Sequence, residues 1–150
     1  MNTLEKKDIK SKNSLFYSVQ VPVRFSEVDA LGIVWHGHYL KFFEDGREAF
    51  GQQYGLSYLD VYKYKFATPL VNINVDYKKT VKYGDSVRIE TTFINSPAAK
   101  IIFNYKIFRT SYNELVATGE STQVFINMDH ELLITIPPFF EEWKRKHGLA

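Results

Sequence analysis

One segment, Ser26–Tyr39, brings together a carboxylate, two histidines and two glycines that could form a catalytic site. Asp29 stands there among apolar neighbours, shortly before a predicted helix. A helix start offers backbone N–H groups and partial positive charge, which can hold the oxygen of a polarised carbonyl. A carboxylate close to such donors can attack a carbonyl or activate water, so the segment suits acyl transfer. A helix cap followed by an ordinary turn explains the same residues, and local chemistry leaves both interpretations open.

His36 and His38 are the other side chains of this segment that could take part in a reaction or bind a metal. Two histidines at this spacing do not share a helix face, and no third ligand is evident in the sequence. We therefore expect no metal, and the chemistry described above needs no cofactor. His36 either orients a substrate or Asp29, or it only caps and packs.

The helix that must position this segment is predicted from about residue 39 to residue 54. Its apolar positions recur at helical spacing: Tyr39, Phe42, Phe43, Gly46, Phe50 and Tyr54. A glycine in mid-helix costs about 1 kcal/mol relative to alanine, so we expect the helix backbone to approach a sheet closely at Gly46. We expect the helix to end at Gly55.

Alternation of apolar and polar residues predicts strands around this helix. The first covers about 17–25, and Pro22, which has no N–H for a ladder, indicates a free edge or a bulge there. Four more are expected in meander-like succession, at about 71–77, 87–93, 101–107 and 115–127. A short helix then begins at Pro137-Pro138 and runs to about Lys146.

One helix against an antiparallel sheet is an α+β architecture. Such a helix leaves sheet surface and an edge strand uncovered. This predicts an identical partner subunit, in a homodimer or homotetramer.

Length and composition limit the class of protein and the kinds of site that it can contain. The 150 residues suit one domain, which we expect over residues 15–150 after a flexible segment at 1–14. A net charge of +2 is too weak to favour nucleic acid. The absence of cysteine excludes disulfides and thiolate metal sites and fits a cytoplasmic protein. The sequence has no run of about 18 apolar residues, so we expect no membrane span.

Residues 24–44 read RFSEVDALGIVWHGHYLKFFE. They resemble the signature of the 4-hydroxybenzoyl-CoA thioesterase family, in which an Asp-x-x-Gly-x-Val turn leads into a His-x-x-Tyr-x-x-x-Phe-Glu helix. Tyr83-Gly84-Asp85 resembles the family's Gly-Asp turn, and residues 129–137 resemble its closing segment. The resemblance implies a hotdog fold, in which an antiparallel sheet wraps around one long central helix, with a short C-terminal helix.

The resemblance also implies an activity, the hydrolysis of an acyl-CoA thioester to a free acid and coenzyme A. Asp29 matches the family's catalytic carboxylate, as nucleophile or general base, and His36 matches the histidine seven residues later. Backbone N–H groups near His36 and Gly37 would polarise the thioester carbonyl. Two positions depart from the family: Phe25 stands where many members have tyrosine, and His38 stands where many have asparagine. The second departure puts hydrogen bonding at the helix start in doubt.

Aromatic residues supply the candidate substrate pocket. In the family, the connection after the helix often borders the acyl pocket, and here that connection is rich in tyrosine. We expect a pocket formed by Trp35, Tyr39, Tyr58, Tyr64 and Phe66. The alternative for the residues of that connection is that they only pack on the core.

Basic residues at predicted strand ends could meet the phosphates of coenzyme A, or could simply be solvated: Lys78, Lys79, Lys82 and Arg88. Two other functions stay open beside acyl-CoA hydrolysis. One is a thioesterase acting on acyl-carrier protein, and the other is a hotdog protein that binds an acyl ligand without turnover. Hotdog dehydration or hydration is less well supported, because the usual dehydratase arrangement is not evident.

Overall fold

The computed structural model describes residues 15–150. Three short 3₁₀ turns, at Phe25–Glu27, His36–His38 and Thr110–Tyr112, accompany the longer elements. These are β1 (Phe16–Pro22), α2 (Tyr39–Tyr54), α3 (Tyr58–Lys63), β2 (Phe66–Ala67), β3 (Leu70–Tyr77), β4 (Ser86–Ile94), β5 (Lys100–Arg109), β6 (Glu114–Val124), β7 (Ile126–Asn127) and α4 (Pro138–Lys146). The predicted long helix, five strands and C-terminal helix are confirmed, whereas α3 and β2 were not predicted. The last strand, predicted as one element over about 115–127, is divided into β6 and β7.

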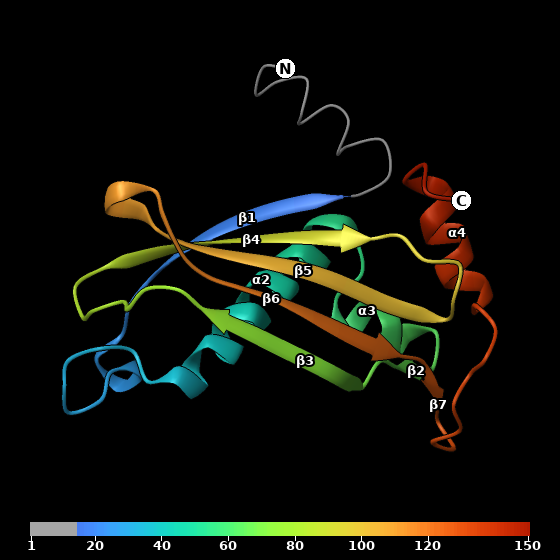
Figure 1. Cartoon of the computed structure of the whole chain (residues 1–150). Coiled ribbons are helices and arrows are strands. Elements are labelled where there is room, and N and C mark those ends of the chain that lie inside the picture. The colour runs from blue at the N-terminus through green and yellow to red at the C-terminus, as the bar shows by residue number, and fades with distance from the viewer. Residues whose placement is uncertain (1–14) are drawn as a thin grey trace.

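The main sheet is antiparallel, with the strand order β1-β4-β5-β6-β3 (Figure 1). The expected meander is correct for β4, β5 and β6, but wrong for β3, which pairs with β6 instead of β4. Periodicity identifies the residues of a strand but not the strand's neighbours, which explains the error. β1 pairs with β4 alone, so Pro22 lies on an edge strand as expected.

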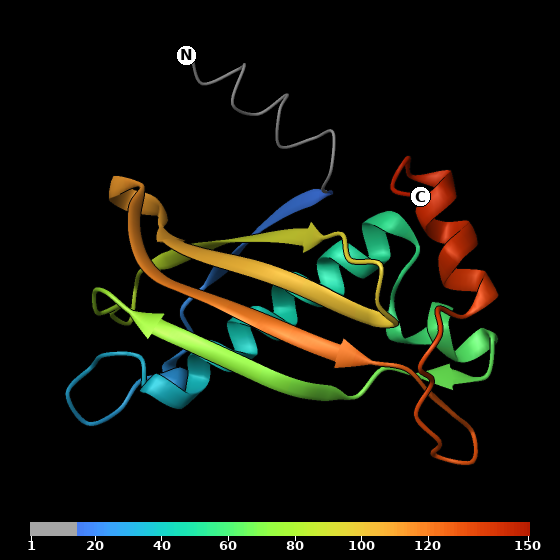
Figure 2. The ribbon, with the colours of Figure 1, turned by 45° about the vertical axis from the view of Figure 1, so that its right-hand side comes forward.

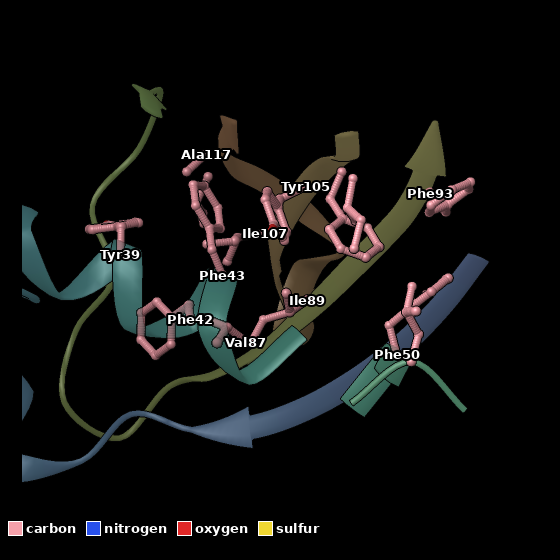
Figure 3. Close-up of a cluster of buried hydrophobic side chains, with 14 of the residues drawn as sticks. Tyr39, Phe42, Phe43, Phe50, Val87, Ile89, Phe93, Tyr105, Ile107 and Ala117 are labelled. Atoms are coloured by element: carbon pink, nitrogen blue, oxygen red, sulfur yellow. The ribbon is translucent and has the colours of Figure 1, made fainter. Parts of the chain in front are cut away.

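Helix α2 packs against one face of this sheet, over β1, β4 and β5 (Figure 2). Its aromatic stripe forms the centre of the core, where Phe43 stacks on Tyr105 with ring centroids 4.4 Å apart (Figure 3). A Cβ at Gly46 would lie 2.4 Å from Thr91 Oγ1, so the expected close approach of helix and sheet is confirmed. Gly55 ends the helix in the left-handed conformation, at φ 73°.

The two ends of α2 face different parts of the molecule. The segment with Asp29 lies at the N-terminal end, whereas α3, β2, β7 and α4 lie towards the C-terminal end (Figures 1 and 2). Sixteen helical residues span about 24 Å. Within residues 15–150, no helix combines the length and apolar character needed to cross a membrane.

Candidate active site

Asp29 lies near the tip of a narrow loop. Val28 and Val34 form an antiparallel bridge, and the Asp29 N–H donates to the Ile33 carbonyl at 2.9 Å. Gly32 turns the chain at φ 76°, a conformation that favours glycine. The Asp29 carboxylate accepts a hydrogen bond from the Leu31 N–H at 2.8 Å. The carboxylate therefore caps its own turn, and the interpretation as a cap of the long helix is wrong.

A second segment fixes this loop from its other side. Ile33 bridges Lys82, and the Val34 N–H donates to the carbonyl of Val81 at 2.8 Å. Val81 is completely buried, so the pairing anchors the loop to the core. Asp29 is half-buried and forms no ion pair with any residue in the range 15–150.

The helix start next to this loop has an extra 3₁₀ turn, His36–His38, that runs directly into α2. The His38 N–H donates to the Trp35 carbonyl at 2.9 Å. No side chain caps α2, because His38 at the cap position makes no such bond. The N–H groups of His36 and Gly37 come first in the turn, where no acceptor within the helix is available. They are the candidate donors to a carbonyl oxygen.

Aromatic rings surround these two N–H groups. The Tyr77 hydroxyl donates to the His36 carbonyl at 2.8 Å and so fixes the turn to the end of β3. The Trp35 indole lies over Gly37, since a Cβ there would lie 2.1 Å from the ring. Sequence reasoning missed Tyr77, because its alternating position in a strand gives no sign of a partner 41 residues away.

The five residues expected to form a substrate pocket do not gather in one chain. Trp35 and Tyr39 lie at the N-terminal end of α2, and burial raises the pKa of the Tyr39 phenol. The other three lie beyond its C-terminal end, where Tyr64 stacks on Phe139 with centroids 4.6 Å apart. Phe66 also packs on Phe139, whereas Tyr58 is 64% exposed.

Tyr58 lines a cavity of about 440 Å³ between α2 and the strands β5 and β6. Polar side chains dominate its wall, including Arg47 from α2 and Gln123 from β6. The Nη1 atom of Arg47 is buried without a hydrogen-bond partner in the described part of the chain. Burial raises the pKa of the Asp45 carboxyl at the same cavity. The cavity therefore combines an aromatic rim with a polar wall.

No metal site is evident in the described range, since no three histidine or carboxylate side chains between residues 15 and 150 gather in a ligand group. Activity without a metal or cofactor remains a prediction.

Comparison with known proteins gives these features a context. A sequence profile of the thioesterase-like superfamily matches residues 23–144. A Bacillus subtilis protein, provisionally named an acyl-CoA thioesterase, is 30% identical over 131 residues, which cover 87% of this chain and 94% of the relative. The matched residues 23–144 include the Asp29 loop, α2 and four of the five strands of the main sheet, all but β1.

Solved structures agree with this. The structure of DHNA-CoA thioesterase from Staphylococcus aureus superimposes with a TM-score of 0.78 at 27% identity, covering 87% of this chain and 89% of the other. The 4-hydroxybenzoyl CoA thioesterase of a Pseudomonas species gives a TM-score of 0.74 at 24% identity, over 85% of this chain and 98% of the other. At this low identity, the similarity supports the fold alone. The expected hotdog fold is confirmed.

Proposed function

The chain belongs to the thioesterase-like superfamily, and from this premise we propose that it hydrolyses an acyl-CoA thioester to a free acid and coenzyme A. The observation that carries the proposal is the position of Asp29, on a loop anchored to the core and joined to the start of α2. A carboxylate without an ion-pair partner among residues 15–150 and a helix start with available N–H groups are the two components that acyl transfer requires.

Two chemical routes are compatible with Asp29. As a nucleophile, the carboxylate bonds to the thioester carbon, the C–S bond breaks, and the coenzyme A thiolate leaves and takes up a proton. Water then hydrolyses the mixed anhydride, which releases the acid and restores Asp29. As a general base, Asp29 takes a proton from the water that attacks the thioester carbon. The C–S bond then breaks, and the proton passes to the departing coenzyme A thiolate. In both routes the N–H groups of His36 and Gly37 hold the negatively charged carbonyl oxygen.

The acyl carrier is tested by offering the same acyl group on coenzyme A and on acyl-carrier protein. We expect a higher kcat/KM for the coenzyme A substrate. Preference for the carrier protein would assign the enzyme to that substrate instead, and tight binding of both without thiol release would favour the ligand-binding alternative.

A second copy of the chain completes the site in this proposal. β3 lies at the edge of the described sheet, pairs with β6 alone and exposes Leu70, Val71 and Tyr77. An exposed apolar edge favours pairing with another strand, and a two-fold axis would make the two β3 strands antiparallel. The Asp29 end of one subunit would then face the Tyr58 end of the other. The separated pocket residues would form one site between two chains.

Disrupting this edge is expected to give an inactive monomer. Val71→Lys places a charge on a side chain that is 56% exposed, and an edge lysine opposes strand pairing. Sedimentation velocity at micromolar concentration should show a dimer or larger for the parent and a monomer for the variant, with most of the activity lost. Ile134→Lys, at a loop residue that is 87% exposed, is the matched control and should change neither. A monomeric, active parent would contradict the shared site.

We expect the preference of the enzyme for particular acyl groups to depend on residues just beyond the C-terminal end of α2. Tyr58→Ala combined with Tyr64→Ala removes two rings that are 64% and 57% exposed, so we expect a shift in acyl-chain preference with little change in melting temperature. The measurement is kcat/KM across short, long and aromatic acyl-CoAs. Tyr112→Ala, which removes a ring that is 80% exposed elsewhere, is the control. An unchanged preference with a large loss of melting temperature would mean that the two rings only pack.

A further inference from the structure

Arg109, the last residue of β5, carries its charge on the face of the sheet that α2 covers. It pairs with Val87 across the β4–β5 ladder and lies two residues after Ile107, and both of these apolar side chains are completely buried on that face (Figure 3). The Arg109 side chain itself is only 18% exposed. A charged side chain that is mostly buried needs partners, so the groups that Arg109 contacts indicate what it does.

The guanidinium of Arg109 contacts three acceptors. Its Nη2 atom donates to the Thr80 carbonyl at 3.3 Å and to the Glu114 carboxylate at 3.4 Å, and its Nη1 atom lies 3.8 Å from the Asp85 carboxylate. Glu114 begins β6, whereas Thr80 and Asp85 are the two ends of residues 80–85, the anchor segment, in the connection between β3 and β4. A planar guanidinium can serve several acceptors at once, and here it ties both ends of the anchor segment to β5 and β6.

The anchor segment carries the Asp29 loop. Between its two ends it pairs with the loop through Val81 and Lys82. The Lys82 N–H donates to the Asp85 carboxylate at 2.9 Å, and the same carboxylate pairs with Arg109. Figure 1 shows the loop and the β3–β4 connection at the same end of the molecule. A shift of the anchor segment would therefore move the loop with it, and the contacts of Arg109 oppose such a shift.

The same guanidinium lies close to the support of the helix start. Burial raises the pKa of the Tyr39 phenol, Tyr77 adds to this effect, and the nearby positive charge of Arg109 opposes it. The rings of Tyr39 and Tyr77 meet edge to face with centroids 5.0 Å apart, and the Tyr77 hydroxyl donates to the His36 carbonyl. Arg109 therefore adjoins the supports of both parts of the candidate site, the Asp29 loop and the turn that offers the backbone N–H groups.

Stability alone explains this arrangement poorly. The Nε atom of Arg109 is buried and has no hydrogen-bond partner within residues 15–150. An unsatisfied buried donor costs free energy, and buried ion pairs often contribute little net stability. A guanidinium at this position despite that cost favours a role in fixing the geometry of the segments around it.

We propose that Arg109 is a positioning residue, which holds the Asp29 carboxylate at the correct distance from the N–H groups of His36 and Gly37. The inference rests on the proposed function only for the catalytic role of Asp29. Arg109 touches no substrate, because it acts through the anchor segment. Misplacement of a reacting group by about 1 Å can cost roughly 100-fold in rate, so a small movement of the loop is sufficient to lower turnover.

Hydrogen exchange, which needs no substrate, tests whether Arg109 holds the loop. Arg109→Lys keeps the positive charge, but a single ammonium group on a flexible stem cannot serve all three acceptors. We expect two reporter amides, those of Val34 and Lys82, to exchange roughly 10-fold faster in this variant, because the hydrogen bonds of the anchor segment open more often. The amides of Phe103 and Tyr105, at the centre of the sheet, should exchange at parent rates.

Arg88→Lys is the matched control. The Arg88 side chain is 29% exposed, pairs with Glu90 at 3.2 Å and donates to Asn113 at 2.6 Å, and neither partner belongs to the loop or the anchor segment. Exchange at the two reporter amides should equal that of the parent in this control. Parent rates at both reporter amides in Arg109→Lys would overturn the inference, as would the same acceleration in the control or throughout the sheet.

A double-mutant cycle tests whether Arg109 acts through Asp29. Alone, Arg109→Lys should lower kcat roughly 10-fold or more with KM within about 2-fold of the parent, because the placement of the carboxylate affects the transition state and not substrate binding. Combined with Asp29→Asn, it should lower kcat no further, since no carboxylate remains to be placed. Equal fold losses in the two backgrounds would overturn the inference. If the parent hydrolyses no thioester, the proposed function fails, and hydrogen exchange alone decides whether Arg109 holds the loop.

Discussion

Asp29→Asn is expected to lower turnover of the best acyl-CoA substrate by roughly 100-fold or more, the scale of losing a general base. Asparagine has nearly the same size but can neither attack the thioester carbon as a carboxylate nor take a proton from water. The measurement is kcat by thiol release, together with a melting curve. The loop should keep its structure, because an asparagine side-chain oxygen can still accept the 2.8 Å hydrogen bond from the Leu31 N–H.

Two controls make this result specific. Asp129→Asn removes a carboxylate from an exposed turn and should leave turnover unchanged. Coenzyme A should bind Asp29→Asn with an affinity close to that of the parent, because Asp29 is assigned to chemistry at the thioester, which coenzyme A itself lacks. Turnover close to that of the parent in a folded Asp29→Asn protein would remove the catalytic assignment and favour a protein that only binds acyl ligands.

The second large effect is expected at the helix start, where the role is assigned to a backbone N–H. His36→Pro removes both the imidazole and the N–H, whereas His36→Ala removes the imidazole alone. Proline is favoured at the first position of a helix, and the extended conformation of Trp35 is compatible with a following proline. We therefore expect His36→Pro to fold and to lose roughly 100-fold in kcat, the effect of removing one oxyanion donor.

His36→Ala should lose less than about 10-fold, because it keeps the N–H, and the carbonyl that accepts from Tyr77 is unchanged in both variants. The ratio of the two kcat values separates the effect of losing the backbone N–H from the effect of losing the imidazole. Equal losses in the two variants would instead assign the function to the imidazole. Unchanged turnover in His36→Pro would exclude the His36 N–H as a donor.

Much of the fold could be predicted because local patterns determine it. The aromatic stripe of α2 has helical spacing, and Gly46 in its middle indicated the close approach to Thr91. The position of β3 could not be predicted, because its pairing with β6 depends on contacts between residues far apart in sequence. The short α3 also escaped prediction, since its six residues have too few turns for a periodic signal.

The candidate site was predictable in composition but not in arrangement. The motif identified Asp29, His36 and Gly37, yet no local signal indicated that the Asp29 carboxylate bonds within its own turn. Nor could spacing show that Trp35 and Tyr58 lie at opposite ends of a helix of about 24 Å. In the proposed dimer, residues at opposite ends of α2 in one chain would meet across the interface between two chains.

Thiol detection during incubation with a panel of short, long and aromatic acyl-CoAs shows whether this chain releases a thiol from acyl-CoA repeatedly. We expect saturable release, with many equivalents of thiol per subunit and the free acid as the other product. The same activity should persist after treatment with a metal chelator. Binding of the panel without thiol release would show that the protein only binds acyl ligands, and release that stops with a chelator and returns with zinc would show that the reaction needs a metal.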